Sequence, residues 1–208
     1  MVKYIRILPN MVAAPNWQEI YYHFSSTKEI NQLAHIKNIK TNQMIHNTAI
    51  SKDLANKKLH VIREFDAPVE KVWKAWTESS LLDKWWAPKP WKTETKLMDF
   101  TEGGLWLYCM AGPNGEKAYC RVDFKTINPG QSFSAVSSFC DEDGNADDNF
   151  PRMYWLNEFI ATTTGAKVEV AISFDSEADL QKIVEMGFEG GFNMGLGNLD
   201  ELLQTEEF

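Results

Sequence analysis

Apolar and polar residues alternate through most of the chain after residue 57, as expected for β-strands that bury one face. The alternation is cleanest in residues 167–174, where every second residue is Val, Ile or Phe. Clusters of Gly, Pro, Asn and Asp separate the alternating segments and are typical of turns. This pattern predicts strands at Lys58–Phe65, Lys92–Phe100, Gly104–Met110, Lys117–Ile127, Ser132–Cys140, Met153–Thr162 and Lys167–Phe174.

Two short helices are predicted between the first two strands. Asp66 precedes Pro68, and an acidic cap followed by a proline in the first turn is a common helix start. Ser80 and Asp83 have the spacing of a capping box for a second helix, Leu81–Trp86, which prolines then end. The first helix presents an apolar stripe made of Val69, Val72, Trp73 and Trp76.

The longest predicted helix closes the chain. Ser176 and Asp179 form a capping box, and apolar residues or glycines recur at helical spacing as far as Leu203. The helix would span 28 residues, or roughly 42 Å. The predicted fold class is therefore α+β, with this helix lying across the concave face of a curved antiparallel sheet.

Five glycines crowd the middle of that helix: Gly187, Gly190, Gly191, Gly195 and Gly197. Each destabilises a helix interior by about 1 kcal/mol relative to alanine. Three explanations remain open. The glycines could allow close backbone contact with bulky sheet residues, could leave space for a guest molecule, or could interrupt the helix.

Aromatic residues are abundant in the domain after residue 57. Several tryptophans around missing side-chain volume would form an apolar wall with a few polar points, as in small-molecule sites. The alternative is that they simply fill the core, which we expect for Trp73 and Trp76. The tryptophans after residue 57 are Trp73, Trp76, Trp85, Trp86, Trp91, Trp106 and Trp155.

Four segments carry a resemblance to a known superfamily. Residues 65–77 (Phe-Asp-Ala-Pro-Val-Glu-Lys-Val-Trp-Lys-Ala-Trp-Thr), 82–88, 99–106 and 187–203 resemble the SRPBCC or START-like proteins. Within these, the chain is most similar to the branch named after the activator of the heat-shock protein ninety ATPase. The resemblance covers about residues 57–205. It implies a helix-grip fold, in which a curved sheet grips the long helix and a hydrophobic cavity lies between them.

The same comparison divides the chain into two parts. Residues 57–208 would form the START-like domain, and residues 1–56 an N-terminal extension that is either helical or disordered. Asn16 and Ser26 could each cap a short helix in the extension. The extension carries a net charge of +3 and the domain a net charge of −11, which together give the total of −8.

Charge and composition exclude several classes of function. An acidic domain repels nucleic acid, and no apolar run approaches the roughly 20 residues that span a membrane. Pro9 and Asn10 interrupt the apolar start of the chain, so we expect no secretory signal and a cytoplasmic protein. The odd set of cysteines, Cys109, Cys120 and Cys140, fits reduced thiols.

Known catalytic motifs are missing, and we expect neither a metal ion nor a cofactor. The sequence lacks GxSxG, HExxH and P-loop patterns. His60 stands alone among the residues of the domain, and residues 141–145 lack the spacing of a calcium loop. Two charged strand residues, Arg121 and Glu158, would become polar anchors for a ligand if they face inward.

These observations predict a protein that binds a small, largely apolar molecule in an aromatic-lined cavity. An enzyme of the cyclase, lyase or hydrolase type, with Arg121 or Glu158 as the polar group, is the first alternative. A chaperone-associated or homodimeric module that uses Leu105 and Leu107 is the second. The residues that we expect to line the cavity are Trp85, Trp91, Trp106, Tyr108, Trp155, Phe188, Phe192 and Met194.

Overall fold

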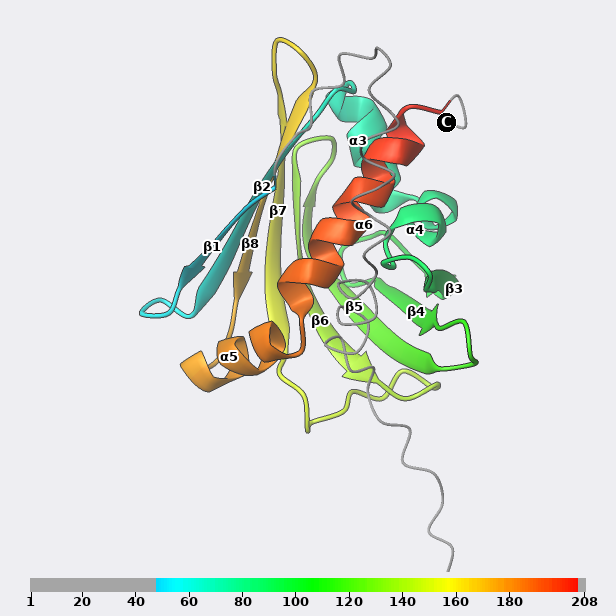
Figure 1. Cartoon of the computed structure of the whole chain (residues 1–208), viewed down its shortest axis with the longest axis vertical. Coiled ribbons are helices and arrows are strands. Elements are labelled where there is room, and N and C mark those ends of the chain that lie inside the picture. The colour runs from blue at the N-terminus through cyan, green and yellow to red at the C-terminus, as the bar shows by residue number, and fades with distance from the viewer. Residues whose placement is uncertain (1–47, 206–208) are drawn as a thin grey trace, which may run out of the picture.

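A computed structural model describes residues 48–205, which form one antiparallel sheet and four helices (Figure 1). The helices predicted near Asn16 and Ser26 lie outside the described residues. The strands follow the order β1-β2-β8-β7-β6-β5-β4-β3 across the sheet. Their bounds are β1 Ala49–Asp53, β2 Lys58–Phe65, β3 Lys92–Met98, β4 Leu105–Ala111, β5 Lys117–Asn128, β6 Ser132–Cys140, β7 Met153–Ala161 and β8 Ala166–Ser173.

The seven predicted strands are all present, with ends within two residues of those expected. One strand, β1, was not predicted. It pairs antiparallel with β2, with Ala49 opposite Ile62 and Asp53 opposite Lys58. Its five residues are mostly exposed, so the strand lacks the alternation that revealed the others. The sheet therefore begins inside the segment that we assigned to the N-terminal extension.

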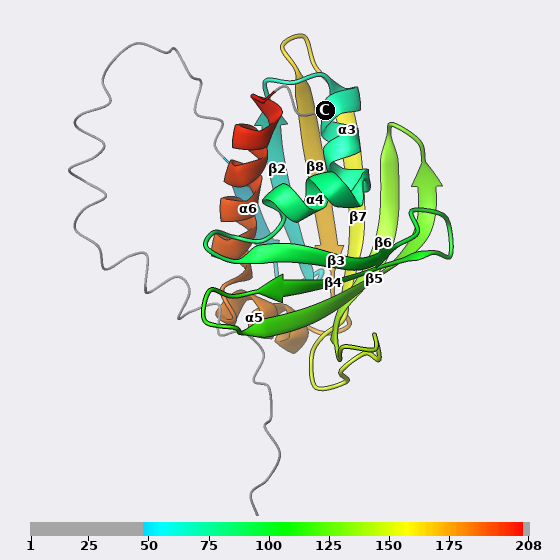
Figure 2. The same ribbon diagram turned by 90° about the vertical axis from the view of Figure 1, so that its right-hand side faces the viewer.

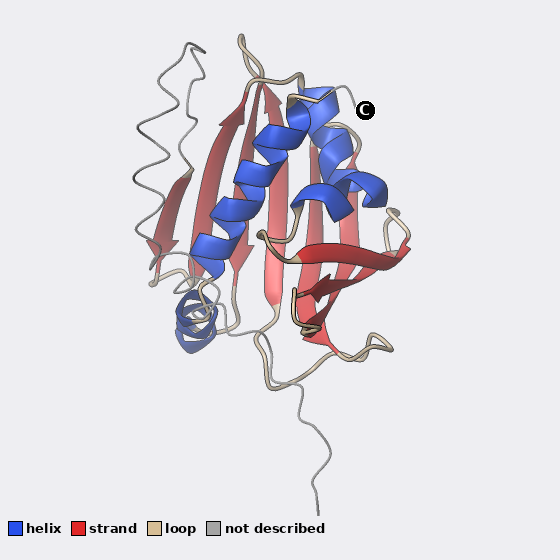
Figure 3. Cartoon of the chain, turned by 45° about the vertical axis from the view of Figure 1, so that its right-hand side comes forward, coloured by secondary structure: helices blue, strands red, loops and turns tan. Residues whose placement is uncertain are grey.

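The sheet is strongly curved. Figure 2 shows β3, β4 and β5 crossing the direction of β2, β7 and β8. The register shifts between Thr95 and Leu97 in β3 and between Phe124 and Thr126 in β5, and such bulges increase bending. The helices cover the concave face (Figure 3). This α+β architecture confirms the predicted helix-grip arrangement.

The short helices differ from the prediction in how they begin. They are α3 (Val69–Thr77) and α4 (Ser79–Trp85), and no side chain caps either one. The predicted capping box in α4 is wrong, because the Asp83 carboxylate accepts bonds from the backbone N (3.0 Å) and Oγ1 (2.6 Å) of Thr95. Asp83 thus ties α4 to strand β3.

The closing helix is two helices, so the prediction of one continuous helix is wrong. α5 (Glu177–Glu185) begins with the predicted capping box, in which Ser176 Oγ accepts a bond from the Asp179 N–H at 3.1 Å. Gly187 has a φ of 87°, a left-handed conformation that ends the first helix and redirects the chain. α6 (Phe188–Leu203) then crosses the sheet.

An ion pair fastens α6 to the sheet. Arg63 on β2 is only 8% exposed, and its Nη2 donates to the carboxylate of Asp200 on α6. Arg63 Nη1 also donates to Thr48 Oγ1 at 2.8 Å. At the end of α6, Lys71 Nζ from α3 donates to the carbonyl of Leu203 at 2.8 Å. Helix α6 is therefore bonded both to strand β2 and to helix α3.

We expect Asp200→Asn to lower the free energy of unfolding by about 2 kcal/mol, because it leaves the buried Arg63 guanidinium without its counter-charge. Urea unfolding would measure this. Glu201→Gln is the matched control, since Glu201 pairs with Lys89 in an exposed position and should matter much less. Equal effects of the two substitutions would contradict the role assigned to the Arg63–Asp200 pair.

Candidate functional site

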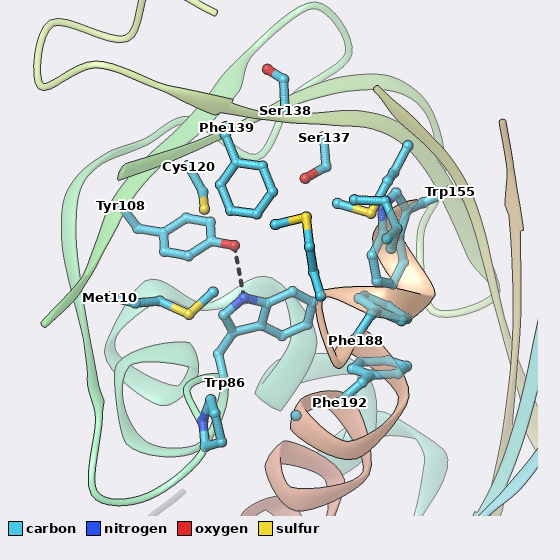
Figure 4. A pocket seen from close by; sticks show the side chains of 15 residues that line it. Trp86, Tyr108, Met110, Cys120, Ser137, Ser138, Phe139, Trp155, Phe188 and Phe192 are labelled. Atoms are coloured by element: carbon cyan, nitrogen blue, oxygen red, sulfur yellow. Dashed lines mark hydrogen bonds between the residues drawn. The ribbon is translucent and has the colours of Figure 1, made fainter. Parts of the chain in front are cut away.

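Two neighbouring cavities lie between the concave face of the sheet and the helices. The larger has a volume of about 70 Å³, and its wall comes from strands β4 to β7, helices α5 and α6, and the residues after α4 (Figure 4). Most of this wall is apolar. Its main side chains are those of Trp86, Tyr108, Met110, Phe139, Trp155 and Phe192.

The smaller cavity has a volume of about 30 Å³ and lies next to the first. Three residues, Trp86, Ser137 and Trp155, line both cavities and so form the boundary between them. Trp76 and Asn157 contribute to the wall of the smaller cavity. Figure 4 shows the Ser137 hydroxyl pointing toward the space and the Ser138 hydroxyl pointing away from it.

Trp86 occupies its boundary position because the backbone on either side of it is fixed. Asn198 Nδ2 on α6 donates to the carbonyl oxygens of Trp85 (3.3 Å) and Ala87 (3.0 Å). The backbone N of Ala87 donates to Thr93 Oγ1 at 3.0 Å. The indole Nε1 of Trp86 then donates to the Tyr108 hydroxyl at 2.9 Å, so both ends of the side chain are held.

Gly195 permits the close approach of α6 to this segment. A methyl group at Gly195 would lie 3.0 Å from the carbonyl oxygen of Trp86 and 3.5 Å from that of Trp85. The contact at 3.0 Å is tighter than ordinary van der Waals packing and involves a backbone atom, so a larger residue would push the helix away. Of the three explanations for the glycines, close backbone contact applies at this position.

The bend between α5 and α6 shapes the other side of the larger cavity. Met186 and Phe188 flank the left-handed Gly187, and both side chains line the space. Phe188 stacks on Phe192 with ring centroids 5.4 Å apart and meets the edge of Trp155 at 5.8 Å. Helix interruption is thus the role of Gly187, and it brings the end of α5 to the cavity.

The site carries no formal charge, because no Asp, Glu, Lys, Arg or His of residues 48–205 lines either cavity. Two titratable groups do line the larger one. Burial raises the pKa of Tyr108 well above its ordinary value of 10.0, and burial raises the pKa of Cys120 to about 12. Both groups are therefore protonated and neutral at physiological pH.

Comparisons with known proteins identify the family. The family model for Activator of Hsp90 ATPase homolog 1-like protein matches residues 66–204, which is most of the described chain. The chain belongs to this family. Its curved sheet and C-terminal helix agree with the superfamily resemblance noted in the sequence. None of the curated proteins matches the chain closely enough to be counted as a relative.

Solved structures show the same fold. A protein from Arthrobacter aurescens is 30% identical and has a TM-score of 0.71, with 74% of this chain and 90% of that chain covered. Protein Ms6760 from Mycobacterium smegmatis is 26% identical with a TM-score of 0.71, covering 78% and 100%. Protein NE0264 from Nitrosomonas europaea is 27% identical with a TM-score of 0.63, covering 74% and 97%.

Five of the eight predicted lining residues reach a cavity in this member of the activator-homologue family. Tyr108, Trp155, Phe188 and Phe192 line the larger cavity, and Trp106 lines the smaller one. Trp106 stacks on the Tyr108 ring with centroids 4.0 Å apart, which makes it part of the same aromatic cluster.

The other three predicted residues, Trp85, Trp91 and Met194, line neither cavity. Trp85 is 1% exposed and its Nε1 donates to the Ala75 carbonyl at 2.9 Å, so it belongs to the core between α3 and α4. Trp91 is buried beside Gly112, and Met194 is half-buried on α6. The expectation that they contact a ligand is not supported by their positions.

The two predicted polar anchors lie on the opposite face of the sheet. Arg121 alternates with the inward-facing Cys120 on β5, and its guanidinium donates to the Asp123 carboxylate at 2.7 and 2.9 Å. Glu158 is exposed and alternates with the buried Asn157 on β7. Strand parity therefore removes both anchors from the cavity and puts Asn157 there instead.

Most lining residues that the sequence analysis missed lie in one of two places. They are either on the inward-facing side of a strand or beside the bend between α5 and α6. Trp86 was counted among the aromatic residues but was not assigned to the site. Inward parity, read once the pairing is known, would have identified Met110, Cys120, Ser137, Phe139 and Met153. Met186 lies beside the bend, directly after α5.

Leu105 and Leu107, the residues that an interaction module would use, are both half-buried. Leu107 lies under the loop after β6, since a Cβ at Gly144 would be 3.5 Å from Leu107 Cδ1.

In the described part of the chain, no helix has the length and apolar character needed to cross a membrane, and no cluster of metal-ligating side chains occurs.

We expect the free energy of unfolding to fall as the pH rises from about 9 to about 12, because folded Cys120 keeps a proton that the unfolded chain releases. Cys120→Ala removes this contribution, so its stability should fall less steeply, by up to about 1.4 kcal/mol per pH unit. Urea unfolding at about pH 8 and pH 10.5 would measure both slopes. Identical slopes would contradict the burial of a protonated thiol.

Proposed function

We propose that the protein binds a small, uncharged, largely apolar molecule in the larger cavity. The observation that carries this proposal is an internal space of about 70 Å³ surrounded by aromatic and sulfur-containing side chains. Concave, mostly apolar sites with a few polar groups are the usual form of small-molecule sites. The family match and its buried aromatic cluster are compatible with such a role.

The size of the cavity favours a compact ligand. A space of this volume excludes a long lipid chain. It is smaller than the roughly 150 Å³ cavity that holds benzene, so a single ring enters only if flexible wall residues such as Met110, Met153 and Met186 move aside. Trp86 and Trp155 each meet Phe192 edge to face and are tilted against each other, and such a wall of aromatic rings suits a further aromatic ring. A monocyclic aromatic compound is therefore a suitable probe.

The neutrality of the walls favours binding over acid–base catalysis. A catalytic acid or base works best when its pKa lies near the working pH, whereas burial holds the pKa values of Tyr108 and Cys120 far above neutrality. The enzyme alternative depended on Arg121 or Glu158, and neither side chain lines a cavity. A ligand with a net charge would also lose its hydration without gaining a counter-charge.

We expect p-xylene to bind the full chain and to be detected by isothermal titration calorimetry and by changes in the NMR signals of cavity residues. Ser137→Leu should weaken this binding about tenfold or more, because its larger side chain would occupy space at the boundary of the two cavities. Ser173→Leu is the matched control. Ser173 is half-buried on the face of β8 that points away from the cavities, so this variant should bind p-xylene as tightly as wild type.

Two results would overturn the proposal. One is the absence of p-xylene binding to folded wild-type protein at concentrations near the solubility of the compound. The other is equal binding by wild type and Ser137→Leu, which would place the ligand outside the cavity.

A further inference from the structure

Four buried side-chain N or O atoms lack a hydrogen-bond partner within residues 48–205. They are Arg63 Nε, Trp76 Nε1, Trp155 Nε1 and Asn157 Oδ1. Three of these four belong to residues that line the smaller cavity. Buried polar atoms are nearly always paired in native proteins, so a group of three around one space indicates a missing partner.

The contrast with the neighbouring tryptophans is sharp. The indole N–H groups of Trp85, Trp86 and Trp106 each donate to a protein oxygen at 2.9 Å. Trp76 is 3% exposed and Trp155 is 7% exposed, yet their indole N–H groups donate to nothing in the protein. Two of the paired indoles, Trp86 and Trp106, line the smaller cavity as well, and the fold still leaves the donors of Trp76 and Trp155 unpaired at its wall.

Asn157 supplies the complementary acceptor. It is 2% exposed, and its Nδ2 reaches only the Phe133 carbonyl, at 3.5 Å. That contact assigns the amide nitrogen to Phe133 and leaves Oδ1 without a donor. A polar side chain buried in this way is destabilising unless a partner fills its bonding capacity.

The three atoms define the chemistry of that partner. A hydroxyl group has two lone pairs and one O–H, which match two indole donors and one amide acceptor. A carboxylate would add a second acceptor beside Asn157 Oδ1 with no cation among the lining residues. An ammonium group can only donate, so it would not pair with the N–H groups of Trp76 and Trp155.

We propose that the smaller cavity is a subsite for the hydroxyl group of a neutral phenol or alcohol, which rests on the proposed binding of an apolar body in the larger cavity. The two spaces share Trp86, Ser137 and Trp155 as walls, so they are adjacent, and a molecule that reaches from the first into the second passes between these side chains. The subsite makes the protein selective for hydroxylated ligands over hydrocarbons of the same shape.

The direct test compares p-cresol with p-xylene, which differ by a hydroxyl in place of a methyl group. We expect p-cresol to bind the full chain about tenfold more tightly, since the hydrocarbon leaves the polar atoms unpaired. In ¹⁵N NMR spectra, the indole signals of Trp76 and Trp155 should move downfield with p-cresol and not with p-xylene. Single Trp→Phe variants assign these two signals.

Asn157→Leu replaces the buried amide by an apolar group of similar size. We expect this variant to lose the preference, with a p-cresol to p-xylene affinity ratio near one, while it still binds p-xylene. Glu158→Gln is the matched control on the exposed face of the same strand, and its ratio should equal that of wild type.

The outcomes separate this inference from the proposed function. Equal affinities for the two compounds in wild type, or indole signals that respond to neither bound compound, would show that the subsite does not recognise the hydroxyl and would overturn the inference alone. Failure of both compounds to bind folded protein would overturn the binding function and the subsite with it. The wild-type comparison decides the question even if Asn157→Leu fails to fold.

Discussion

The contact between helix α6 and the backbone of Trp85–Ala87 determines the interior of this protein. Gly195 lets the helix approach the Trp86 carbonyl, and Asn198 donates to the two carbonyls on either side of it. Together they fix the end of helix α4 and the residues that follow it. The Trp86 indole is thereby held by its hydrogen bond to the Tyr108 hydroxyl. In this position it lies between the two cavities that the sheet and the helices enclose.

Holding that space open lowers stability and provides selectivity at the same time. Cavities and unpaired polar atoms both destabilise a core, and an apolar residue at Asn157 would remove one such penalty. The wall residues instead combine neutral aromatic surface with two unpaired donors and one unpaired acceptor around the smaller cavity. A structure of this kind is typical of recognition, because its unfavourable features disappear when the appropriate molecule is bound.

The fold could largely be predicted from the sequence, because seven strands show period-two alternation and the motifs around Pro68 and Trp86 are specific. Strand β1 could not, since most of its residues are exposed and its order comes from pairing with β2. The sequence left three explanations open for the glycines of the last helix. Gly187 interrupts the helix, whereas Gly195 allows close contact with the Trp86 backbone. Arg121 and Glu158 show the limit for the site, because face assignment depends on pairing that is set by long-range contacts.

The central claim is that the space between the sheet and α6 is hollow and apolar. Xenon enters such cavities without needing any specific polar contact, so a crystal structure of the protein under xenon pressure tests the claim directly. We expect a xenon atom among Tyr108, Phe139, Trp155 and Phe192. A crystal structure in which these side chains meet and exclude xenon from the region would contradict the account.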